Sequence, residues 1–324
     1  MSNQAWQQAE GYLRRADRIL AITHLAPDGD AIGSTLAFAH ALRGMGKVVT
    51  IASQDRPHSR FDYLAGVKDF KQSPTGNFDL IVSIDSSDLQ RLGTAFMPAQ
   101  HGNLNMVVFD HHITNTQFGT VNVVDPQAAS SAEIILKLIH RLNAPITPDI
   151  AVALLTGIIT DTLAFRTSNT TPSTLAAAME LMNAGASLTD ITRNALVLRP
   201  LDQIKFLGAG IAAAEATPEG IVYTRLTRKL RAAAGNTDDR GDAGLVGTLI
   251  TANEAKIAAA FVELADGSVE VGFRAAPGYD VSQVALEFGG GGHPAAAGCT
   301  LPGPMRDVVN RVLTRLKQEI RERG

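Results

Sequence analysis

The sequence predicts an α/β protein with a first domain built on a mainly parallel sheet flanked by helices, a helical linker, and a smaller α/β domain. Its 324 residues exceed what one hydrophobic core usually holds and fit two domains. Short apolar runs such as 80–84 and 106–109 alternate with helix-like stretches, a pattern typical of parallel strands that are covered on both faces. After residue 220 the pattern changes to strands with a hairpin-type Asp-Gly turn at 266–267.

The individual elements follow from hydrophobic spacing and from turn residues. In the first domain we expect strands at 19–23, 47–52, 80–84 and 106–109 and helices at 4–17, 31–45, 131–142, 149–163 and 172–184. In the second we expect strands at 221–226, 256–264 and 268–275 and helices at 243–253, 281–287 and 304–322. The stretch between them has helical spacing and is broken near Pro200. We therefore predict domains at 1–186 and 216–324, joined by a helical linker at 187–215.

Composition and charge exclude several classes of protein. With 45% hydrophobic and 19% charged residues, the chain is neither disordered nor fibrous. No apolar stretch approaches the ~18 residues of a membrane span, and the polar N-terminus gives no sign of an export signal. A net charge of −3 argues against binding of long duplex DNA, which needs many Lys and Arg contacts. Cys299 is the single cysteine, so we expect no intramolecular disulfide, no thiolate cluster and a cytoplasmic location.

Acidic residues and a histidine follow two of the expected strands. His24, Asp28 and Asp30 come directly after the first strand, and a glycine between the two acids lets the loop curl. Asp85 and Asp88 follow the third strand. In an open parallel sheet, ligands collect outside the carboxyl ends of the strands. Taken singly, each segment is better explained as a polar turn in which one acid, such as Asp30, caps the next helix.

Two further segments are harder to explain as turns. Asp110, His111 and His112 follow the fourth expected strand; neutral imidazole is a common metal ligand, and a neighbouring acid can orient its ring. Asp161 interrupts an otherwise apolar helix. A carboxylate there is costly unless it is paired, bound to a metal or exposed at the helix end.

Together these segments predict a metal site at one edge of one sheet. Oxygen and nitrogen ligands without thiolate suit Mn²⁺ or Mg²⁺, with Co²⁺ as an alternative, better than structural zinc. Two such ions ~3.5–4 Å apart could clamp a phosphoryl group and lower the pKa of a bridging water. We therefore expect two divalent ions, with Mn²⁺ as the first candidate.

The same segments resemble, in order and spacing, the motifs of the DHH phosphoesterase family. The matching motifs are His24…Asp28-Gly-Asp30, Asp85, Asp110-His111-His112 and Thr160-Asp161-Thr162. The second half is similar to the companion DHHA1 domain through the run from Phe288 over four glycines to His293 and on to Gly298. The resemblance covers nearly the whole chain.

The resemblance implies which side chains hold the ions and which meet the substrate. It assigns one ion to His24 and Asp28 and the other to Asp30, His111 and Asp161, with Asp85 bridging the two. It places His112 over the substrate phosphate, as a donor or general acid, with Asp110 orienting the histidine pair. Asp85, Asp110 and His112 are thus the expected catalytic residues. Arg91 and Asn115 match the family as well and are expected to bind substrate.

The expected second domain carries features of substrate binding. Gly290, Gly291 and Gly292 allow close approach of the backbone to a ligand and can offer N–H groups to phosphate, although a flexible loop would explain a glycine run by itself. His293 and the small residues after it favour a binding role. Arg274 is a candidate phosphate clamp, because guanidinium meets phosphate with two parallel hydrogen bonds. The family often has serine around this arginine, whereas alanines follow it here, which bears on fine substrate selectivity.

With these two domains, the chain is most similar to family members that act on very short substrates. We expect hydrolysis of short single-stranded RNA or DNA oligonucleotides to mononucleotides, removal of the 3′-phosphate from nucleotide 3′,5′-bisphosphates such as pAp, or both. The alternative is cleavage of dinucleotides, either linear pApA or cyclic di-AMP. A metal-bound nucleotide sensor without catalysis would need a lost ligand, and none is lost. No long duplex or membrane is expected as a partner, and a homodimer is compatible with the sequence.

Overall fold

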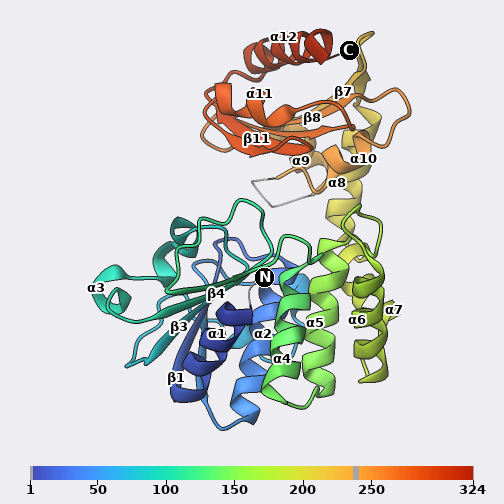
Figure 1. Ribbon diagram of the computed structural model, residues 1–324. Coiled ribbons are helices and arrows are strands. Elements are labelled where there is room, and N and C mark those ends of the chain that lie inside the picture. The colour runs from blue at the N-terminus through green and yellow to red at the C-terminus, as the bar shows by residue number, and fades with distance from the viewer. Residues whose placement is uncertain (1–2, 236–240, 324) are drawn as a thin grey trace. The chain divides into compact units, whose positions relative to one another are not determined.

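The computed structural model describes residues 3–235 and 241–323. The chain divides into two compact units, Met1–Leu198 and Arg199–Gly324, and each unit is a sheet with helices packed on it (Figure 1). The helices expected in the linker are shared between the units. α7 (Leu188–Thr192) and the π-helical turn η4 (Arg193–Val197) belong to the first unit, and α8 (Leu201–Ala212) belongs to the second.

The first unit is built on a five-stranded parallel sheet with the order β2-β1-β3-β4-β5. Its strands are β1 (Arg18–Thr23), β2 (Val48–Ala52), β3 (Leu80–Ile84), β4 (Met106–Asp110) and β5 (Val121–Val124). Every residue of β3 and β4 is buried, as expected of parallel strands that are covered on both faces. The strand order reverses between β1 and β3, and such a switch point is where open α/β sheets bind ligands.

Long helices cover one face of this sheet. They are α1 (Asn3–Arg15), α2 (Gly29–Gly44) and α4 (Ser131–Leu142), with α5 (Pro148–Asp161) and α6 (Pro172–Asn183) packed outside them. The approach of α2 to α5 is close: a Cβ on Gly33 would lie 2.2 Å from the carbonyl oxygen of Ala153. Trp6 of α1 is 2% exposed, and its ring centroid lies 6.1 Å from that of Phe109. The tryptophan therefore anchors α1 on the core.

Shorter segments cover the opposite face. They are the 3₁₀ helix η3 (Leu89–Ala95) and α3 (Pro98–His101), and Leu92 packs there against Ile22, Ile81 and Val108 of the sheet. Two more single turns, η1 (Ser59–Phe61) and η2 (Val67–Asp69), contribute to the core on the side of the long helices. The sheet is therefore buried on both faces, which leaves its carboxyl edge for the site.

The sequence does not predict β5. It runs parallel to β4, yet only residues 111–120 join the two strands. Parallel neighbours are usually joined by a longer crossover that contains a helix, so the periodicity of a βαβ unit is missing here. The short connection is the irregular loop that begins with His111 and His112.

The second unit has a six-stranded mixed sheet with the order β10-β11-β9-β8-β7-β6. β7 and β8 run parallel, and the other neighbours run antiparallel. The strands are β6 (Glu215–Ala216), β7 (Ile221–Leu226), β8 (Ile257–Glu263), β9 (Val269–Ala275), β10 (Gly291–His293) and β11 (Ala296–Leu301). α11 (Val281–Glu287) and α12 (Met305–Arg323) pack on one face, and α8 packs with α9 (Arg228–Ala233) and α10 (Leu245–Leu249) on the other.

The sequence does not predict β10 and β11 either. Alanine and glycine dominate both strands, and these residues have low strand propensity. Pairing of β11 with β9 along six residues overrides that preference. The glycine-rich segment, for which a flexible loop was an alternative, is thus an ordered hairpin.

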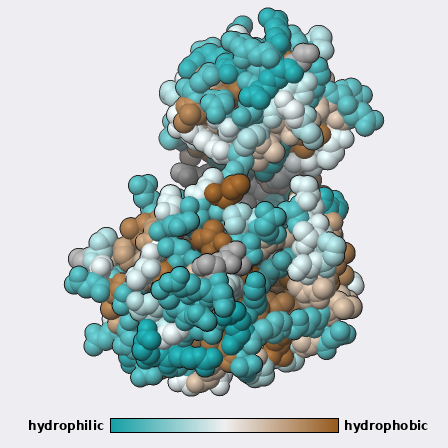
Figure 2. Space-filling view, in the orientation of Figure 1, coloured by the Kyte–Doolittle hydropathy of each residue, from teal (hydrophilic) through white to brown (hydrophobic). Residues whose placement is uncertain are grey.

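The surface and the helices agree with the composition. None of the described helices is both long and apolar enough to cross a membrane. Figure 2 shows hydrophilic residues over most of the visible face, with hydrophobic residues in small groups. Scattered groups of this kind are normal on a protein surface.

Candidate metal centre

The expected metal-binding residues of the first unit gather at the carboxyl edge of the sheet. His24 and Asp28 follow β1, Asp85 follows β3, and His111 follows β4. Three sets have ligand atoms that all lie within 4.8 Å of one another: His24 with Asp28 and Asp85, Asp30 with His111 and Asp161, and Asp85 with His111 and His112. Because parallel strands end at the same edge, segments far apart in the chain meet there.

The loop after β1 presents His24 with one ring nitrogen free. His24 is 4% exposed, and its Nδ1 lies 2.6 Å from the carbonyl oxygen of Leu25, which leaves Nε2 to face the carboxylates. Nε2 lies 3.9 Å from Asp28 and 3.7 Å from Asp85. Burial lowers the pKa of His24, which favours the neutral ring. Asp28 caps α2 by accepting two backbone N–H groups, so the cap is Asp28 and not Asp30.

Asp30 is fully buried and caps a different helix, α4. Its Oδ2 accepts the N–H of Ser131 at 2.6 Å, and its Oδ1 accepts the N–H of Ala132 at 3.0 Å and the hydroxyl of Ser34 at 2.9 Å. The free N–H groups and the dipole of a helix N-terminus stabilise a carboxylate in this position. Oδ2 also lies 4.0 Å from Nε2 of His111, so this oxygen is directed at the centre.

Asp85 belongs to two of the three sets of ligand atoms. It is 1% exposed, and its φ of 60° places it in the left-handed region, which is uncommon for a residue other than glycine and is often found at functional sites. Its Oδ2 faces His24, whereas its Oδ1 lies 3.7 Å from Nε2 of His111 and accepts the hydroxyl of Ser131 at 2.9 Å. One oxygen of Asp85 therefore faces His24 and the other faces His111.

The two adjacent histidines use their ring nitrogens differently. Nδ1 of His111 lies 3.4 Å from the carbonyl oxygen of Ala128, and Nε2 faces the carboxylates. In His112, Nδ1 lies 2.7 Å from Oδ1 of Asp110, so Nε2 is the nitrogen left for another partner. In the described residues, Asp110 forms its hydrogen bond to a histidine with the ring of His112 and not with that of His111.

Asp161 is the last residue of α5, and its side chain is 25% exposed. Its Oδ2 lies 3.3 Å from Nε2 of His111. A helix C-terminus does not stabilise a carboxylate, because the dipole is negative there. Two residues after Asp161 the chain makes a turn in which Leu163, Ala164 and Phe165 all have a positive φ. Such a turn is costly for residues other than glycine, and strain of this kind concentrates at functional sites.

The crowding of carboxylates changes their protonation. Burial, followed by repulsion between neighbouring carboxylates, raises the pKa of Asp30 to about 8, of Asp85 to about 7 and of Asp161 to about 10. For His112, burial lowers the pKa, but the hydrogen bond to Asp110 and nearby negative charge outweigh it and raise the pKa to about 9. A divalent cation would relieve this repulsion. The donor set therefore fits a metal.

Arg91 and Asn115, both expected to bind substrate, lie beside the centre. Arg91 is in η3, and its positive charge is one of the influences that lower the pKa of His24. Asn115 donates one amide hydrogen bond to Asp110 at 2.6 Å and another to a backbone carbonyl at 3.0 Å. Asn115 therefore hydrogen-bonds to one oxygen of Asp110, and the other oxygen of Asp110 hydrogen-bonds to His112.

In the second unit, the glycine-rich segment forms the hairpin of β10 and β11. A Cβ on Gly290 would lie 2.1 Å, and one on Gly292 2.5 Å, from a backbone carbonyl oxygen of β11. These two glycines are therefore required by the hairpin itself. Gly291, in contrast, has nothing within 4 Å of the position of a Cβ and is exposed, as is His293.

Arg274 and His293 lie on one face of the second sheet. Ala296 of β11 pairs with His293 on one side and with Arg274 of β9 on the other. Directly opposed residues on neighbouring strands point to the same face. The small side chain of Ala296 thus separates two groups that can donate to an anion. Arg274 is half-buried, and its Nη1 donates to the carbonyl of Phe273 at 2.9 Å.

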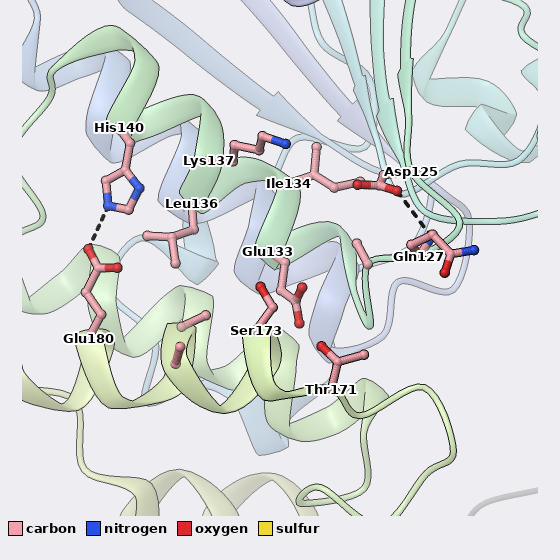
Figure 3. Close-up of a pocket in the computed structure, with 13 residues that line it drawn as sticks. Asp125, Gln127, Glu133, Ile134, Leu136, Lys137, His140, Thr171, Ser173 and Glu180 are labelled. Atoms are coloured by element: carbon pink, nitrogen blue, oxygen red, sulfur yellow. Dashed lines mark hydrogen bonds and ion pairs between the residues drawn. The ribbon is translucent and has the colours of Figure 1, made fainter. Parts of the chain in front are cut away.

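A groove of about 610 Å³ lies elsewhere on the first unit, between α4 and α6 (Figure 3). Its walls include Glu133, Lys137 and an ion pair in which Nε2 of His140 lies 2.6 Å from Glu180. None of the expected catalytic, metal-binding or substrate-binding residues lines it. The ligand atoms, and not this groove, mark the candidate site.

Two further residues, Ser131 and Gly157, contact the carboxylates of the centre or leave room for them, and no role was predicted for either from the sequence. Ser131 donates to both Asp85 and Asp30. Gly157 of α5 leaves room for Asp30, because a Cβ there would lie 2.6 Å from its Oδ1. Serine at a helix start and glycine within a helix are common, so their local sequence does not indicate these contacts.

Two domain models match the chain. The N-terminal domain of the DHH family matches residues 18–158, and the DHHA1 domain matches residues 222–322. The chain is 34% identical over 312 residues to the bifunctional oligoribonuclease and PAP phosphatase NrnA of Thermus thermophilus, covering 94% of this chain and 91% of that protein. It is 25% identical over 213 residues to a probable manganese-dependent inorganic pyrophosphatase of Enterococcus faecalis, covering 58% of this chain and 67% of that protein.

A solved structure extends the likeness to the fold. An exopolyphosphatase-related protein from Bacteroides fragilis aligns with a TM-score of 0.91 at 21% identity, over 99% of this chain and 98% of its own. Both units therefore have known counterparts. The motifs, the strand-end cluster and the relatedness along almost the whole chain lead to one assignment: the chain belongs to the DHH family of phosphoesterases and carries a DHH domain followed by a DHHA1 domain.

Proposed function

We propose that the chain is a two-metal phosphoesterase that hydrolyses short single-stranded oligonucleotides to mononucleotides and removes the 3′-phosphate of pAp. The observation that carries the proposal is the convergence of all six expected ligands on one edge of the sheet. The relative named for these two activities is similar along 94% of the chain. The similarity to the pyrophosphatase spans only 58% of the chain, which favours a nucleotide substrate over pyrophosphate.

The arrangement of donors supports two ions. In the proposal His24 and Asp28 hold one ion, Asp30, His111 and Asp161 hold the other, and Asp85 bridges them. Carboxylate and imidazole donors without thiolate suit Mn²⁺, with Mg²⁺ or Co²⁺ as alternatives. When bound, the ions would supply Lewis acidity to the phosphoryl group and ease deprotonation of an attacking water.

The side chains around the ions have separate tasks. Nδ1 of His112 is engaged by Asp110, so its Nε2 can donate a proton to a phosphate oxygen or to the leaving oxygen. Asn115 holds Asp110 in place, which fixes the orientation of the ring. Arg91, beside His24, carries a positive charge that can meet the charge of the substrate.

In the proposal, the second unit recognises the nucleotide. Arg274 and His293 share a sheet face across Ala296, and the strand Gly291–His293 is exposed. Guanidinium and imidazole both bind phosphate well. The net charge of −3 favours a short substrate with few phosphates over a long strand.

One experiment tests the function. Metal-free protein, reloaded with Mn²⁺, is offered pAp, pApA, cyclic di-AMP and labelled RNA of two to twenty-four residues. We expect fast release of mononucleotides from the shortest RNAs and phosphate release from pAp, with slow turnover of the 24-mer. EDTA should abolish both activities, and Mn²⁺ should restore them better than Ca²⁺, whose looser coordination suits imidazole poorly.

Two outcomes would contradict the proposal. Full activity after metal removal would exclude the metal mechanism. Turnover restricted to cyclic di-AMP or pApA would move the chain to the dinucleotide phosphodiesterases, which need the same centre but a different substrate.

A further inference from the structure

Ser131 directs both of its polar groups at the carboxylates of the metal centre. It is fully buried at the first position of α4. Its hydroxyl donates to Oδ1 of Asp85 at 2.9 Å, and its N–H donates to Oδ2 of Asp30 at 2.6 Å. One residue thus contacts two carboxylates from different segments, Asp30 at the start of α2 and Asp85 directly after β3.

The hydroxyl of Ser131 is a hydrogen-bond donor to Asp85. In the described part of the chain, it is the one hydroxyl or N–H that donates to this carboxylate. With Oδ1 held by Ser131, Oδ1 lies 3.7 Å from His111 and Oδ2 lies 3.7 Å from His24. Rotation of the carboxylate would break this division, and among the described residues the histidines that face the buried Asp85, His112 included at 3.8 Å, lie beyond hydrogen-bond distance.

The neighbouring serine provides a built-in comparison. Ser130 is also fully buried and occupies the N-cap position of α4, yet its hydroxyl has no hydrogen-bond partner among the described residues. Asp30 takes over the capping of α4 instead. The two adjacent serines therefore differ in one respect that matters here, the contact to Asp85.

We propose that Ser131 is a positioning residue that holds Asp85 in the orientation in which it serves both ions. The inference rests on the proposed metal centre. Residues that orient a metal ligand commonly change metal affinity by ~10- to 100-fold when they are removed. Ser131 would act through Asp85 and would not itself touch an ion or the substrate.

The test measures Mn²⁺ binding by equilibrium dialysis of metal-free protein with metal analysis. Ser131→Ala should weaken binding of at least one Mn²⁺ by roughly tenfold or more, whereas Ser130→Ala should bind as the wild type does. In an Asp85→Ala background, adding Ser131→Ala should change Mn²⁺ affinity less than about twofold, because the carboxylate that Ser131 contacts is already absent.

Each result decides a different point. If the wild type binds no Mn²⁺, the proposed metal centre itself is wrong. If the wild type binds Mn²⁺ but Ser131→Ala binds it equally well, the positioning role is wrong. It is also wrong if Ser131→Ala lowers Mn²⁺ affinity in the Asp85→Ala background by as much as in the wild type. If circular dichroism shows that Ser131→Ala does not fold, Ser131→Cys replaces it, because cysteine is similar in size and is a weaker hydrogen-bond donor. It should then lose affinity by the same route, and unchanged binding would overturn the inference.

Discussion

The candidate metal centre of the first unit and the glycine hairpin of the second unit differ in how strongly each is preorganised for its ligand. In the first, Asp30, Asp85 and Asp110 are at most 1% exposed, and each accepts at least one hydrogen bond from another segment. In the second, the strand Gly291–His293 is exposed throughout. Fixed dipoles and charges are effective in catalysis because they need no reorganisation during the reaction. In the proposal the second unit only has to recognise the nucleotide, and an exposed surface is sufficient for that.

The centre is the place to expect the largest effect. Asp85→Asn keeps the size of the side chain but removes the negative charge that faces His24 and His111. We expect turnover to fall by ~10²-fold or more, with circular dichroism unchanged. Asp17→Asn, in an exposed position before β1, is the matched control and should be fully active. More than about a tenth of wild-type activity in Asp85→Asn would exclude the bridging role.

Variants of His111 and His112 test whether the first binds a metal ion and the second transfers a proton. His112→Ala should lower kcat by ~10²-fold while retaining Mn²⁺, because its engaged nitrogen contacts Asp110 and not an ion. His111→Ala should lose about one Mn²⁺ per chain, because its Nε2 faces Asp30, Asp85 and Asp161. Metal analysis of the two purified variants separates these outcomes. Equal metal loss would mean that both histidines are ligands.

Arg274→Ala probes the second unit and should have a smaller effect. Loss of a charge-assisted contact of ~1.5–3 kcal/mol should raise KM for short oligonucleotides about ten- to a hundredfold. Slow hydrolysis of bis-p-nitrophenyl phosphate, which is too small to need this contact, should be unchanged. Arg225→Ala is the control, since this arginine of the same sheet pairs with Glu215. Equal damage to both substrates would place Arg274 in the catalytic centre.

The contrast between the two regions also explains what the sequence could predict. Candidate metal ligands could be predicted because strong signals coincide: apolar runs mark buried parallel strands, and His24, Asp85 and Asp110 directly follow three of these runs. The fold places those strand ends together whatever the loops do. Asp30 shows the limit of this reasoning, because its partners on α4 lie 101 and 102 residues away, and no local pattern reports such a contact.

The hairpin shows the opposite case. Its residues were singled out, but its secondary structure was missed, since Ala296–Leu301 becomes a strand only through pairing with β9. The sequence also treats the four glycines as equivalent. The structure separates them: Gly290 and Gly292 are confined by the backbone of β11, and Gly291 is not.

That separation gives the last prediction, which has the smallest expected effect. The φ of Gly291 is not positive, and nothing lies within 4 Å of the position that a Cβ would take. Gly291→Ala should therefore leave the melting temperature unchanged or raise it slightly. If a phosphate approaches the backbone there, the added methyl should raise KM for pAp a few-fold and leave kcat and bis-p-nitrophenyl phosphate hydrolysis unaffected. Gly290→Ala is the matched opposite, because its Cβ would meet a carbonyl oxygen at 2.1 Å. It should lower stability by ~1–3 kcal/mol, which thermal denaturation would detect. An unchanged KM in Gly291→Ala would show that the ligand does not touch the open side of the hairpin, and recognition would then rest on Arg274 and His293.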